Sequence, residues 1–387
     1  MENFEEKACL CALNRIFGFE PKTALALIGH FGSAKEIFRM SAADLEAVTG
    51  PYFRHKGEIC LRAEEDAAEE LLKLEQKGIR FCGWTEECYP PLLKECEDAP
   101  VGIYVRSKTP LKSLWSGKRY ISIVGTRDIS PYGREWCGKI VKSLADTAEK
   151  PVIVSGLALG TDIEAHRTAL ECGLPTIGVM ATGPDSIYPW RHRETAEIMA
   201  SAPGCALVTD YPPETAPLAI HFLRRNRIIA GLSGATILVE SKIRGGGMTT
   251  CRLAFSYSRD VYALPGRVDD LRSQGCNILI RQKIAEPLTC TESLIEDLGL
   301  GVSKTGSEPV GQKLRRIFKD RTSDDCIERM SAILGLIRKD RGATIDELAR
   351  ASGSDYSLTA QTVHLLEMEG LITIDLLQRC SINYKNV

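Results

Sequence analysis

The sequence lacks the long apolar runs and the strong net charge that mark several broad classes of protein. No apolar run approaches the roughly 20 residues that a membrane span needs. The N-terminus, MENFEEKACL, has neither the basic start nor the small-residue cleavage site of a signal peptide, so we expect a cytoplasmic protein without membrane contact. The net charge of −2 argues against binding by bulk electrostatics, and any contact with nucleic acid therefore needs a local basic patch.

Clustered metal ligands and two catalytic signatures are also missing. The 14 cysteines are scattered and include no CxxC pair, whereas zinc sites need thiolates or imidazoles at short spacing. We therefore expect no metal site and reduced, mostly buried thiols. Neither the GxxxxGK[ST] phosphate loop nor the GxSxG nucleophile elbow is present, so the sequence gives no support for ATP hydrolysis or for a serine hydrolase.

What the sequence does contain is enough length, 387 residues with 44% hydrophobic content, to form two or three cores. Between about residues 81 and 298, short strand-like runs alternate with amphipathic segments, which is the βαβ rhythm of a parallel sheet. We expect strands at residues 102–105, 120–124, 152–154, 176–180, 206–209, 236–239 and 261–264.

The first of three strand–turn–helix units is YISIVGTRDISPYGREW. Its turn contains Gly125, Thr126 and Arg127, and Ser130 is the expected N-cap of a helix with Pro131 at its first position. Such a turn presents free backbone N–H groups to an anion. From this turn Arg127 could reach a phosphate; the alternative is a surface salt bridge.

The second unit, PVIVSGLALGTDIEAHRTAL, repeats this geometry. Its turn and the start of its helix contain Ser155, Gly156, Gly160, Thr161 and Glu164. We expect the last two to form a capping box. Asp162 and His166 are spaced i,i+4 on one helix face. Because the nucleophile elbow is absent, we expect a structural hydrogen bond between them and not a hydrolase triad with Ser155.

The third unit lies in FLRRNRIIAGLSGATILVESKIRGGGMTT, residues 222–250. Its polar and glycine positions are Arg224, Arg225, Asn226, Arg227, Glu240, Gly245, Gly246, Gly247 and Thr249. The glycines are expected to open a helix after the strand that ends in Glu240. Arg225 and Arg227 lie two apart and so point to different helix faces. We expect one to bind an anion while the other pairs internally with a carboxylate such as Glu240 or Asp210.

Three such units imply a doubly wound, Rossmann-like parallel sheet whose turns gather at the carboxyl edge, where ligands bind in such folds. Two of the three units carry arginine, which favours an extended anionic ligand.

These units also resemble a known family. The segments IVGTR, VSGLALGTDIEAH, FLRRNRIIAGLS, GGGMTT and YALPG with Ser273-Gln274-Gly275 occur, between about residues 89 and 288, in the order and spacing of the DprA/Smf family of DNA-processing proteins. The resemblance implies an extended Rossmann-like core that binds single-stranded DNA, protects incoming DNA and loads the RecA recombinase during natural transformation. It implies no catalytic activity and no cofactor, and we expect a homodimer.

The chain departs from the family pattern in two places. The family's asparagine after YP is replaced, the segment reading Tyr188-Pro189-Trp190-Arg191-His192. The glycine-alanine pair often found after the last core helix is absent from residues 281–285. The first departure concerns the DNA groove.

The predicted DNA-binding residues are Gly125, Thr126, Arg127, Ser130, Ser155, Gly156, Gly160, Arg191, Arg224, Arg225, Asn226, Arg227, Gly245, Gly246, Gly247 and Thr249. Asp162, His166 and Glu240 are assigned structural roles, and no catalytic residue or metal is expected. Tyr188, Trp190 and Tyr257 are candidates for stacking on bases or for core packing.

The competing hypothesis is a small-nucleotide-binding enzyme of the phosphoribohydrolase type. Those enzymes are similar in carrying a GGxGT turn with a downstream glutamate. Here GGGMTT is followed by CRLAFSYSR, which contains no acidic residue, and this absence favours the DNA-binding hypothesis.

Domains are expected on both sides of the core at residues 81–298. Residues 1–80 form a helical domain that resembles a sterile-alpha-motif or helix-hairpin-helix unit, with N-caps at Ser33 and Ser41 and a helix end at Gly50. Residues 299–320 are expected to form a flexible linker. Residues 321–387 show a winged-helix pattern: a capping box of Thr344 and Glu347, a second helix from about residue 358 to 368 and a strand at 371–374. That second helix contains no lysine or arginine, so we expect protein–protein contact and not duplex binding.

Overall fold

The computed structural model describes residues 2–301, 310–319, 321–339, 342–375 and 378–382. They belong to two compact units, Met1–Ser303 and Lys304–Val387. Residues 302–309 of the predicted linker lie outside the described residues.

The first unit begins with helices, as predicted. They are α1 (Glu2–Ile16), α2 (Pro21–Phe31), α3 (Ala34–Arg39), α4 (Ala42–Thr49), the 3-10 helix η1 (Arg54–Gly57) and α5 (Leu61–Gln76). The predicted caps are confirmed: Ser33 and Ser41 accept hydrogen bonds from the first turns of α3 and α4, and Gly50 follows the last residue of α4. These local signals act within four residues, which is why the sequence alone reveals them.

A mostly parallel sheet follows, with strands β1 (Ile79–Gly83), β2 (Gly102–Arg106), β3 (Tyr120–Val124), β4 (Val152–Ser155), β5 (Thr176–Val179), β6 (Ala206–Thr209), β7 (Ala235–Leu238), β8 (Asp260–Ala263) and β9 (Glu286–Pro287). Their order is β1-β2-β6-β5-β4-β3-β7-β8-β9. The β1–β2 and β2–β6 pairs are antiparallel, and the other pairs are parallel. The predicted strands are confirmed. The strands at the two edges, β1 and β9, were not predicted.

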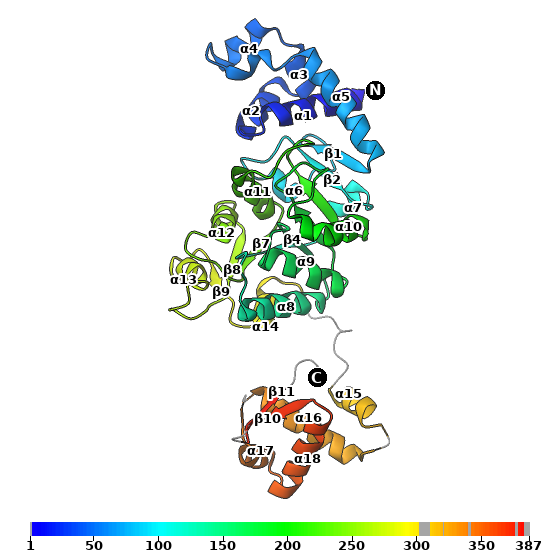
Figure 1. Cartoon of the computed structure of the whole chain (residues 1–387), viewed down its shortest axis with the longest axis vertical. Helices are drawn as coiled ribbons and strands as arrows, with labels where there is room; N and C mark the ends of the chain where they lie inside the picture. Colours follow the sequence, from blue (N-terminus) through cyan, green and yellow to red (C-terminus); the bar gives the residue numbers. More distant parts are fainter. Residues whose placement is uncertain (1, 302–309, 320, 340–341, 376–377, 383–387) are drawn as a thin grey trace. The chain divides into compact units, whose positions relative to one another are not determined.

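Helices cover both faces of the sheet, as a doubly wound fold requires (Figure 1). The helices of this region are α6 (Pro91–Lys94), α7 (Leu111–Trp115), α8 (Pro131–Ala145), α9 (Thr161–Glu171), η2 (Trp190–His192), α10 (Arg193–Ser201), α11 (Ala219–Gly231), α12 (Gly246–Ser256), α13 (Gln274–Arg281) and α14 (Thr291–Asp297). Alternate residues of β3 face opposite layers. Val124 packs with α11, α12 and α13, whereas Ile121 and Ile123 pack with α8, α9 and α14.

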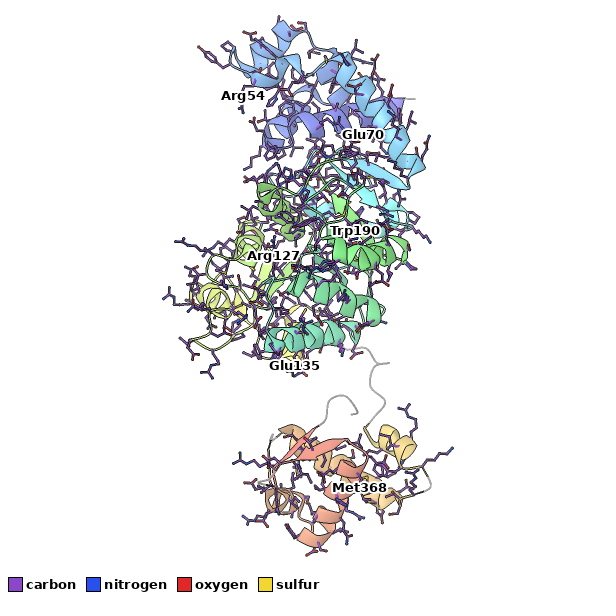
Figure 2. The ribbon with its side chains drawn as sticks, viewed as in Figure 1. Arg54, Glu70, Arg127, Glu135, Trp190 and Met368 are labelled. Atoms are coloured by element: carbon purple, nitrogen blue, oxygen red, sulfur yellow. A yellow bond between two sulfur atoms is a disulfide. The ribbon has the colours of Figure 1, made fainter. Side chains whose placement is uncertain are left out.

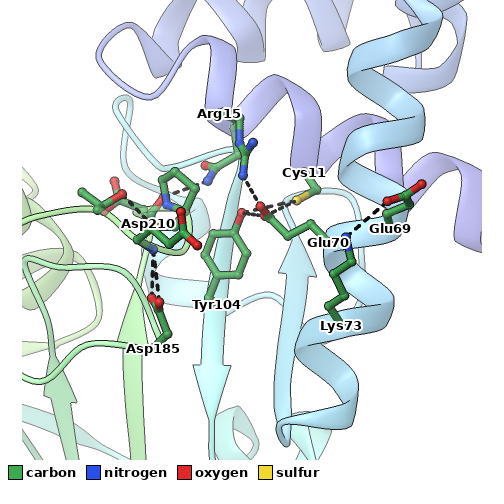
Figure 3. A network of polar contacts seen from close by, with 12 residues as sticks. Cys11, Arg15, Glu69, Glu70, Lys73, Tyr104, Asp185 and Asp210 are labelled. Atoms are coloured by element: carbon green, nitrogen blue, oxygen red, sulfur yellow. Dashed lines mark hydrogen bonds and ion pairs between the residues drawn. The ribbon is translucent and has the colours of Figure 1, made fainter.

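The N-terminal helices share a core with the edge of the sheet. Figure 3 shows Tyr104 of β2 donating its hydroxyl to Glu70 of α5 over 2.9 Å, with the Cys11 thiol of α1 at 3.3 Å from the same hydroxyl. Arg15 of α1 forms an ion pair with Glu70. Burial, reinforced by the Glu70 carboxylate, raises the pKa of Cys11 to about 12. The buried side chains Phe81 and Tyr104 belong to the same apolar cluster as the interior of α1, so the helices are anchored to the sheet by packing and hydrogen bonds.

The second unit contains α15 (Val310–Ile317), α16 (Asp324–Lys339), α17 (Ile345–Ser352), α18 (Tyr356–Met368) and an antiparallel pair, β10 (Ile372–Ile374) and β11 (Cys380–Ile382). The capping box of Thr344 and Glu347 is confirmed. The predicted extent of the linker is wrong, because α15 lies inside residues 299–320. Its side chain Leu314, together with Phe318, is buried in the core of this unit.

One cysteine pair corrects the prediction of reduced thiols. Cys82 and Cys88 form a disulfide, since the turn after β1 brings their Cα atoms to 6.4 Å. Glu86 lies beside them, the three ligand atoms being within 4.8 Å of one another. Its carboxylate already accepts the Gly83 N–H at 2.7 Å and pairs with Lys7 at 3.0 Å. No helix within the described ranges is both long and apolar enough to cross a membrane.

Candidate nucleic-acid interface

A groove of about 720 Å³ opens at the carboxyl edge of the sheet. It lies between the turn that follows β3 and the turn that follows β7, two adjacent strands whose connections run to opposite sides of the sheet. This is the topological switch point at which open α/β sheets bind ligands. The lining residues are Val124, Gly125, Thr126, Arg127, Asp128, Ala158, Asp162, Tyr188, Pro217, Ala219, Phe222, Leu223, Arg225, Asn226, Ile229, Ser241, Lys242, Arg244, Gly245, Gly246, Gly247 and Thr250.

One wall of the groove joins a cation to two aromatic rings. The guanidinium of Arg127 lies 5.2 Å from the ring centre of Phe222 on α11. That ring meets Tyr188 edge-on, with 5.5 Å between centres. Arg127 is exposed and has no carboxylate partner among the described residues, so the salt-bridge alternative finds no support there. Figure 2 labels Arg127, which lines the groove.

The opposite wall is the start of α12. Gly245 is its N-cap and Gly246 its first residue, so unpaired backbone N–H groups face outward there. Beyond Gly246 the space is open, because a Cβ at that position would meet no atom closer than Asn226 Nδ2 at 4.0 Å. Lys242 and Arg244 stand exposed in the same turn. A helix N-terminus and three cations therefore converge on one groove, although the chain as a whole is slightly acidic.

The second turn, between β4 and α9, supports the wall that carries Arg127. Gly160 has a φ of +76°, and a Cβ there would overlap the Thr126 carbonyl oxygen. Thr161 donates its backbone N–H to that oxygen over 3.1 Å, and its hydroxyl donates over 3.2 Å. The predicted capping box at the start of α9 is wrong. Gly160 is the N-cap, and Glu164 pairs instead with Arg134 at 3.0 Å.

Arg225 lies beneath the groove and not across its surface. Its side chain is buried and donates to the backbone carbonyl oxygens of Gly156 and Val179. Burial lowers its pKa to about 10, although the nearby Asp162 carboxylate opposes this effect. Burial likewise raises the pKa of Asp162, against the attraction of Arg225. The carboxylate of Asp162 accepts the Gly156 N–H at 3.1 Å and the Ala158 N–H at 3.3 Å. Arg225 and Asp162 are thus buried groups of opposite charge that hold the second turn through its backbone, Arg225 at the Gly156 carbonyl oxygen and Asp162 at the Gly156 N–H.

The other two arginines of α11 face away from the groove, which corrects their assignment as groove residues. Arg227 is buried, pairs with Asp210 and donates to the Asp98 carbonyl. This confirms that one of Arg225 and Arg227 pairs internally with a carboxylate. Arg224 donates to the Gly18 carbonyl, and its guanidinium lies 3.9 Å from the ring centre of Phe19. It joins α11 to the N-terminal helices.

Two further polar residues of β4 and α9, Ser155 and His166, lie in the interior. Ser155 is fully buried and donates its hydroxyl to the Ile123 carbonyl over 2.6 Å, which corrects its assignment to a DNA contact. The expected hydrogen bond between Asp162 and His166 is also wrong. His166 instead places Nδ1 2.7 Å from the Thr176 hydroxyl oxygen, and burial, helped by the cations around it, lowers its pKa to about 3.

Glu240 has a structural contact, but its partner is Ser130 and not an arginine of α11. Its carboxylate accepts the backbone N–H of Ser130 at 2.9 Å and the Ser130 hydroxyl, at the N-terminus of α8. Ser130 is the N-cap of α8, as predicted, and its hydroxyl accepts the Gly133 N–H. Tyr257 is a core residue rather than a stacking surface, because its hydroxyl donates to Asp98 over 2.6 Å.

The predicted residues thus divide into two groups. Those that line the groove are Gly125, Thr126, Arg127, Arg225, Asn226, Gly245, Gly246 and Gly247. Those that do not are Ser130, Ser155, Gly156, Gly160, Arg191, Arg224, Arg227 and Thr249. The sequence reasoning missed Phe222, Lys242 and Arg244. The two cations could have been found from their position directly before the glycine run.

The groove and its sheet define a class of protein: a Rossmann-like α/β protein with an anion-binding groove at the switch point of the sheet. The family model for DNA recombination-mediator protein A matches residues 80–299. The chain belongs to this family, whose members carry the names DprA and Smf, and the resemblance noted from the motifs is confirmed.

Three curated relatives give the extent of the similarity. Protein Smf of Escherichia coli is 37% identical over 60% of this chain and 60% of its own length. DNA processing protein DprA of Streptococcus pneumoniae is 37% identical over 51% of this chain and 67% of its own length. A putative DNA processing protein DprA of Mycobacterium tuberculosis is 31% identical over 80% of this chain and 79% of its own. The match to the E. coli protein therefore spans less than two thirds of that relative.

Two solved structures share the fold. DprA from S. pneumoniae superposes with a TM-score of 0.63 and 28% identity, covering 77% of this chain and 98% of that one. DNA processing protein A from Helicobacter pylori gives a TM-score of 0.50 at 28% identity, covering 56% and 95%. The latter structure was described for the single-stranded DNA binding mode of that protein.

Proposed function

We propose that the groove binds single-stranded DNA. The observation that carries the proposal is the arrangement of Arg127, free of carboxylate partners among the described residues and stacked on Phe222, opposite the open N-terminus of α12 at Gly246. Phosphates would bind at the helix N-terminus and at Arg127, Lys242 and Arg244. The rings of Phe222 and Tyr188 offer faces and edges to unstacked bases, which are available in a single strand and not in a duplex.

The residues proposed to contact DNA directly are Gly125, Thr126, Arg127, Asn226, Gly245, Gly246 and Gly247. Arg225 acts from beneath the groove, because its guanidinium supports the second turn and contributes positive potential. The structure of the H. pylori relative, described for its single-stranded DNA binding mode, supports the binding of single-stranded DNA by this chain.

We further infer that the protein acts in DNA processing during natural transformation, protecting incoming strands and loading the RecA recombinase on them. It would do so in the cytoplasm, as a homodimer and without a chemical step of its own. Membership of the recombination-mediator family supports this role. In the second unit, the order α16, α17, α18 and the β10–β11 pair is consistent with a winged helix. We propose that this unit contacts protein rather than duplex DNA, because α18 contains no lysine or arginine.

The test is a titration of wild type and Arg127→Ala against a labelled oligonucleotide over a series of salt concentrations. Loss of one phosphate contact should weaken binding and reduce the salt slope by about 0.7. Arg62→Ala is the matched control, since Arg62 is an exposed arginine of α5, away from the groove. Unchanged affinity and slope in Arg127→Ala would overturn the proposal.

The same titration separates the proposal from a small-nucleotide enzyme. Unlabelled single strands should displace the probe, while duplex and mononucleotides should compete poorly. Efficient displacement by a mononucleotide would favour the phosphoribohydrolase alternative.

A further inference from the structure

All four tryptophans lie within the described residues, and among them only Trp190 is exposed. Its side chain is 68% exposed, whereas Trp84, Trp115 and Trp136 are buried or half-buried. The indole is covered in part by the guanidinium of Arg193, which lies 4.5 Å from the ring centre. Keeping a ring of this size in water forgoes the stabilisation that its burial would give, so core packing does not explain its position.

The backbone that carries Trp190 is held firmly, although the indole is not. Trp190 begins η2, and His192 at the end of η2 is buried. The ring of His192 places Nδ1 2.8 Å from the Leu157 carbonyl oxygen in the second turn. The backbone N–H of His192 donates to the Pro189 carbonyl oxygen over 2.9 Å. An exposed aromatic side chain on a fixed segment is preorganised for a ligand, because little backbone order is lost on binding.

Trp190 also lies beside the groove. Tyr188, two residues earlier, is part of the groove wall. Its ring contacts the ring of Phe222, over which the guanidinium of Arg127 lies. Two peptide links limit the distance between the Cα atoms of Tyr188 and Trp190 to about 7 Å. Figure 2 labels both Trp190 and Arg127. The aromatic wall therefore continues beyond the groove as an exposed indole.

Two arginines follow this indole closely in the sequence. Arg191 and Arg193 are both exposed, and neither has a carboxylate partner among the described residues. The neighbouring acidic residue in the sequence is Glu194, at the start of α10. An exposed indole with one guanidinium at its ring and a second arginine next to it in the sequence has the chemistry that takes one unstacked base together with the adjoining phosphates.

We propose that Trp190, Arg191 and Arg193 form a second contact site for single-stranded DNA, which receives the strand after it leaves the groove at Tyr188. One base stacks on the indole, and the adjoining phosphates meet the two arginines. The inference rests on the proposed binding of single-stranded DNA in the groove and adds to it a site that lengthens the bound segment.

The test compares oligothymidylates of increasing length on wild type, Trp190→Ala and Trp190→Phe. The shortest strands that bind wild type should bind Trp190→Ala equally well, because they fill only the groove. Longer strands should lose at least about fivefold in affinity on Trp190→Ala, the effect of one lost stacking contact. Trp190→Phe should retain part of the increase in affinity that wild type shows with increasing strand length. Tyr52→Ala is the control, since Tyr52 is a 95% exposed ring in the N-terminal helical region.

Indole fluorescence provides a second measurement. Long strands should quench the emission of wild type, and the quenching should be absent from Trp190→Phe. Arg191→Ala and Arg193→Ala should each reduce the salt slope for long strands by about 0.7. Equal affinity of wild type and Trp190→Ala at every length, with quenching that persists in Trp190→Phe, would overturn the second site. A uniform loss at all lengths would also overturn it, because Trp190 would then belong to the groove.

Failure of the proposed function gives a different pattern. If Trp190→Ala weakens the binding of long strands while Arg127→Ala changes nothing, the groove proposal fails, and Trp190 is a strand contact that does not extend a groove site. If wild type binds no single strand of any length, both proposals fail.

Discussion

Replacing Gly246 by Asp should abolish most of the affinity for single-stranded DNA without unfolding the protein. A Cβ at this position points into open space, its nearest neighbour being Asn226 Nδ2 at 4.0 Å. Gly246 is the first residue of α12, and a carboxylate in the first turn favours a helix through its dipole. We therefore expect the free energy of unfolding to change by no more than about 0.5 kcal/mol.

The loss of affinity follows from charge repulsion. The new carboxylate would occupy the position proposed for a phosphate or lie next to it. Two negative charges about 5 Å apart repel by about 0.8 kcal/mol at the dielectric constant of water and about 3 kcal/mol at an effective value near 20. The groove is lined by protein and open to solvent, so the effect lies between these limits. Binding should weaken by roughly fourfold to 150-fold.

Fluorescence anisotropy of one labelled oligonucleotide, measured at two salt concentrations, gives the result directly. The difference from wild type should shrink at high salt, because screening shortens the range of the repulsion. Gly246→Ala should bind nearly as wild type, which separates charge from size. Gly29→Asp is the matched control, as Gly29 is exposed on α2 with no atom within 4 Å of its Cβ. Wild-type affinity in a folded Gly246→Asp would refute the placement of phosphate at α12.

Three other perturbations have definite expected outcomes. Asp210→Ala leaves Arg227 buried without its carboxylate and should cost about 3–5 kcal/mol in urea unfolding; a loss below about 1 kcal/mol would contradict the structural role of the pair. Because burial holds the pKa of His166 near 3 against about 6.5 in the unfolded chain, its contribution to stability is complete above pH 6.5 and is lost as the pH falls towards 3. Between pH 7.5 and pH 5 this amounts to about 2 kcal/mol, and urea titrations should show a flatter dependence in His166→Gln; an equally steep one would disprove the assignment. Removing residues 304–387, a separate compact unit, should change single-strand affinity less than tenfold, or about 1.4 kcal/mol; a larger loss with a folded core would show that this unit contributes to DNA binding.

The sequence by itself determined the central strands of the sheet, their parallel direction and the edge at which the groove opens. Short apolar runs followed by glycine turns and capped helices are local patterns, and the strands and the N-caps at Ser33, Ser41 and Ser130 formed where those patterns lie. Three such units require parallel strands, whose carboxyl ends share one edge. The placement of Gly125 and Gly246 in one groove followed from that geometry without knowledge of any long-range contact.

Local patterns did not give the edges of the sheet or the Cys82–Cys88 disulfide. Strand β9 is two residues long and exposed, so it lacks the apolar run that identifies a strand. The disulfide joins two cysteines only six residues apart, but it depends on the conformation of the turn between β1 and α6, which the spacing alone does not reveal.

Only the tertiary structure decided what each polar side chain does. Arg224, Arg225 and Arg227 follow one another on α11, and periodicity predicts that they point in different directions without saying what they meet. Arg224 meets the carbonyl of Gly18, 206 residues away in the sequence, and Arg227 meets Asp210. Arg127 alone of the predicted cations reaches the open groove unpaired. A helix has a periodic set of faces, but the packing of other elements against it determines which face remains accessible to DNA.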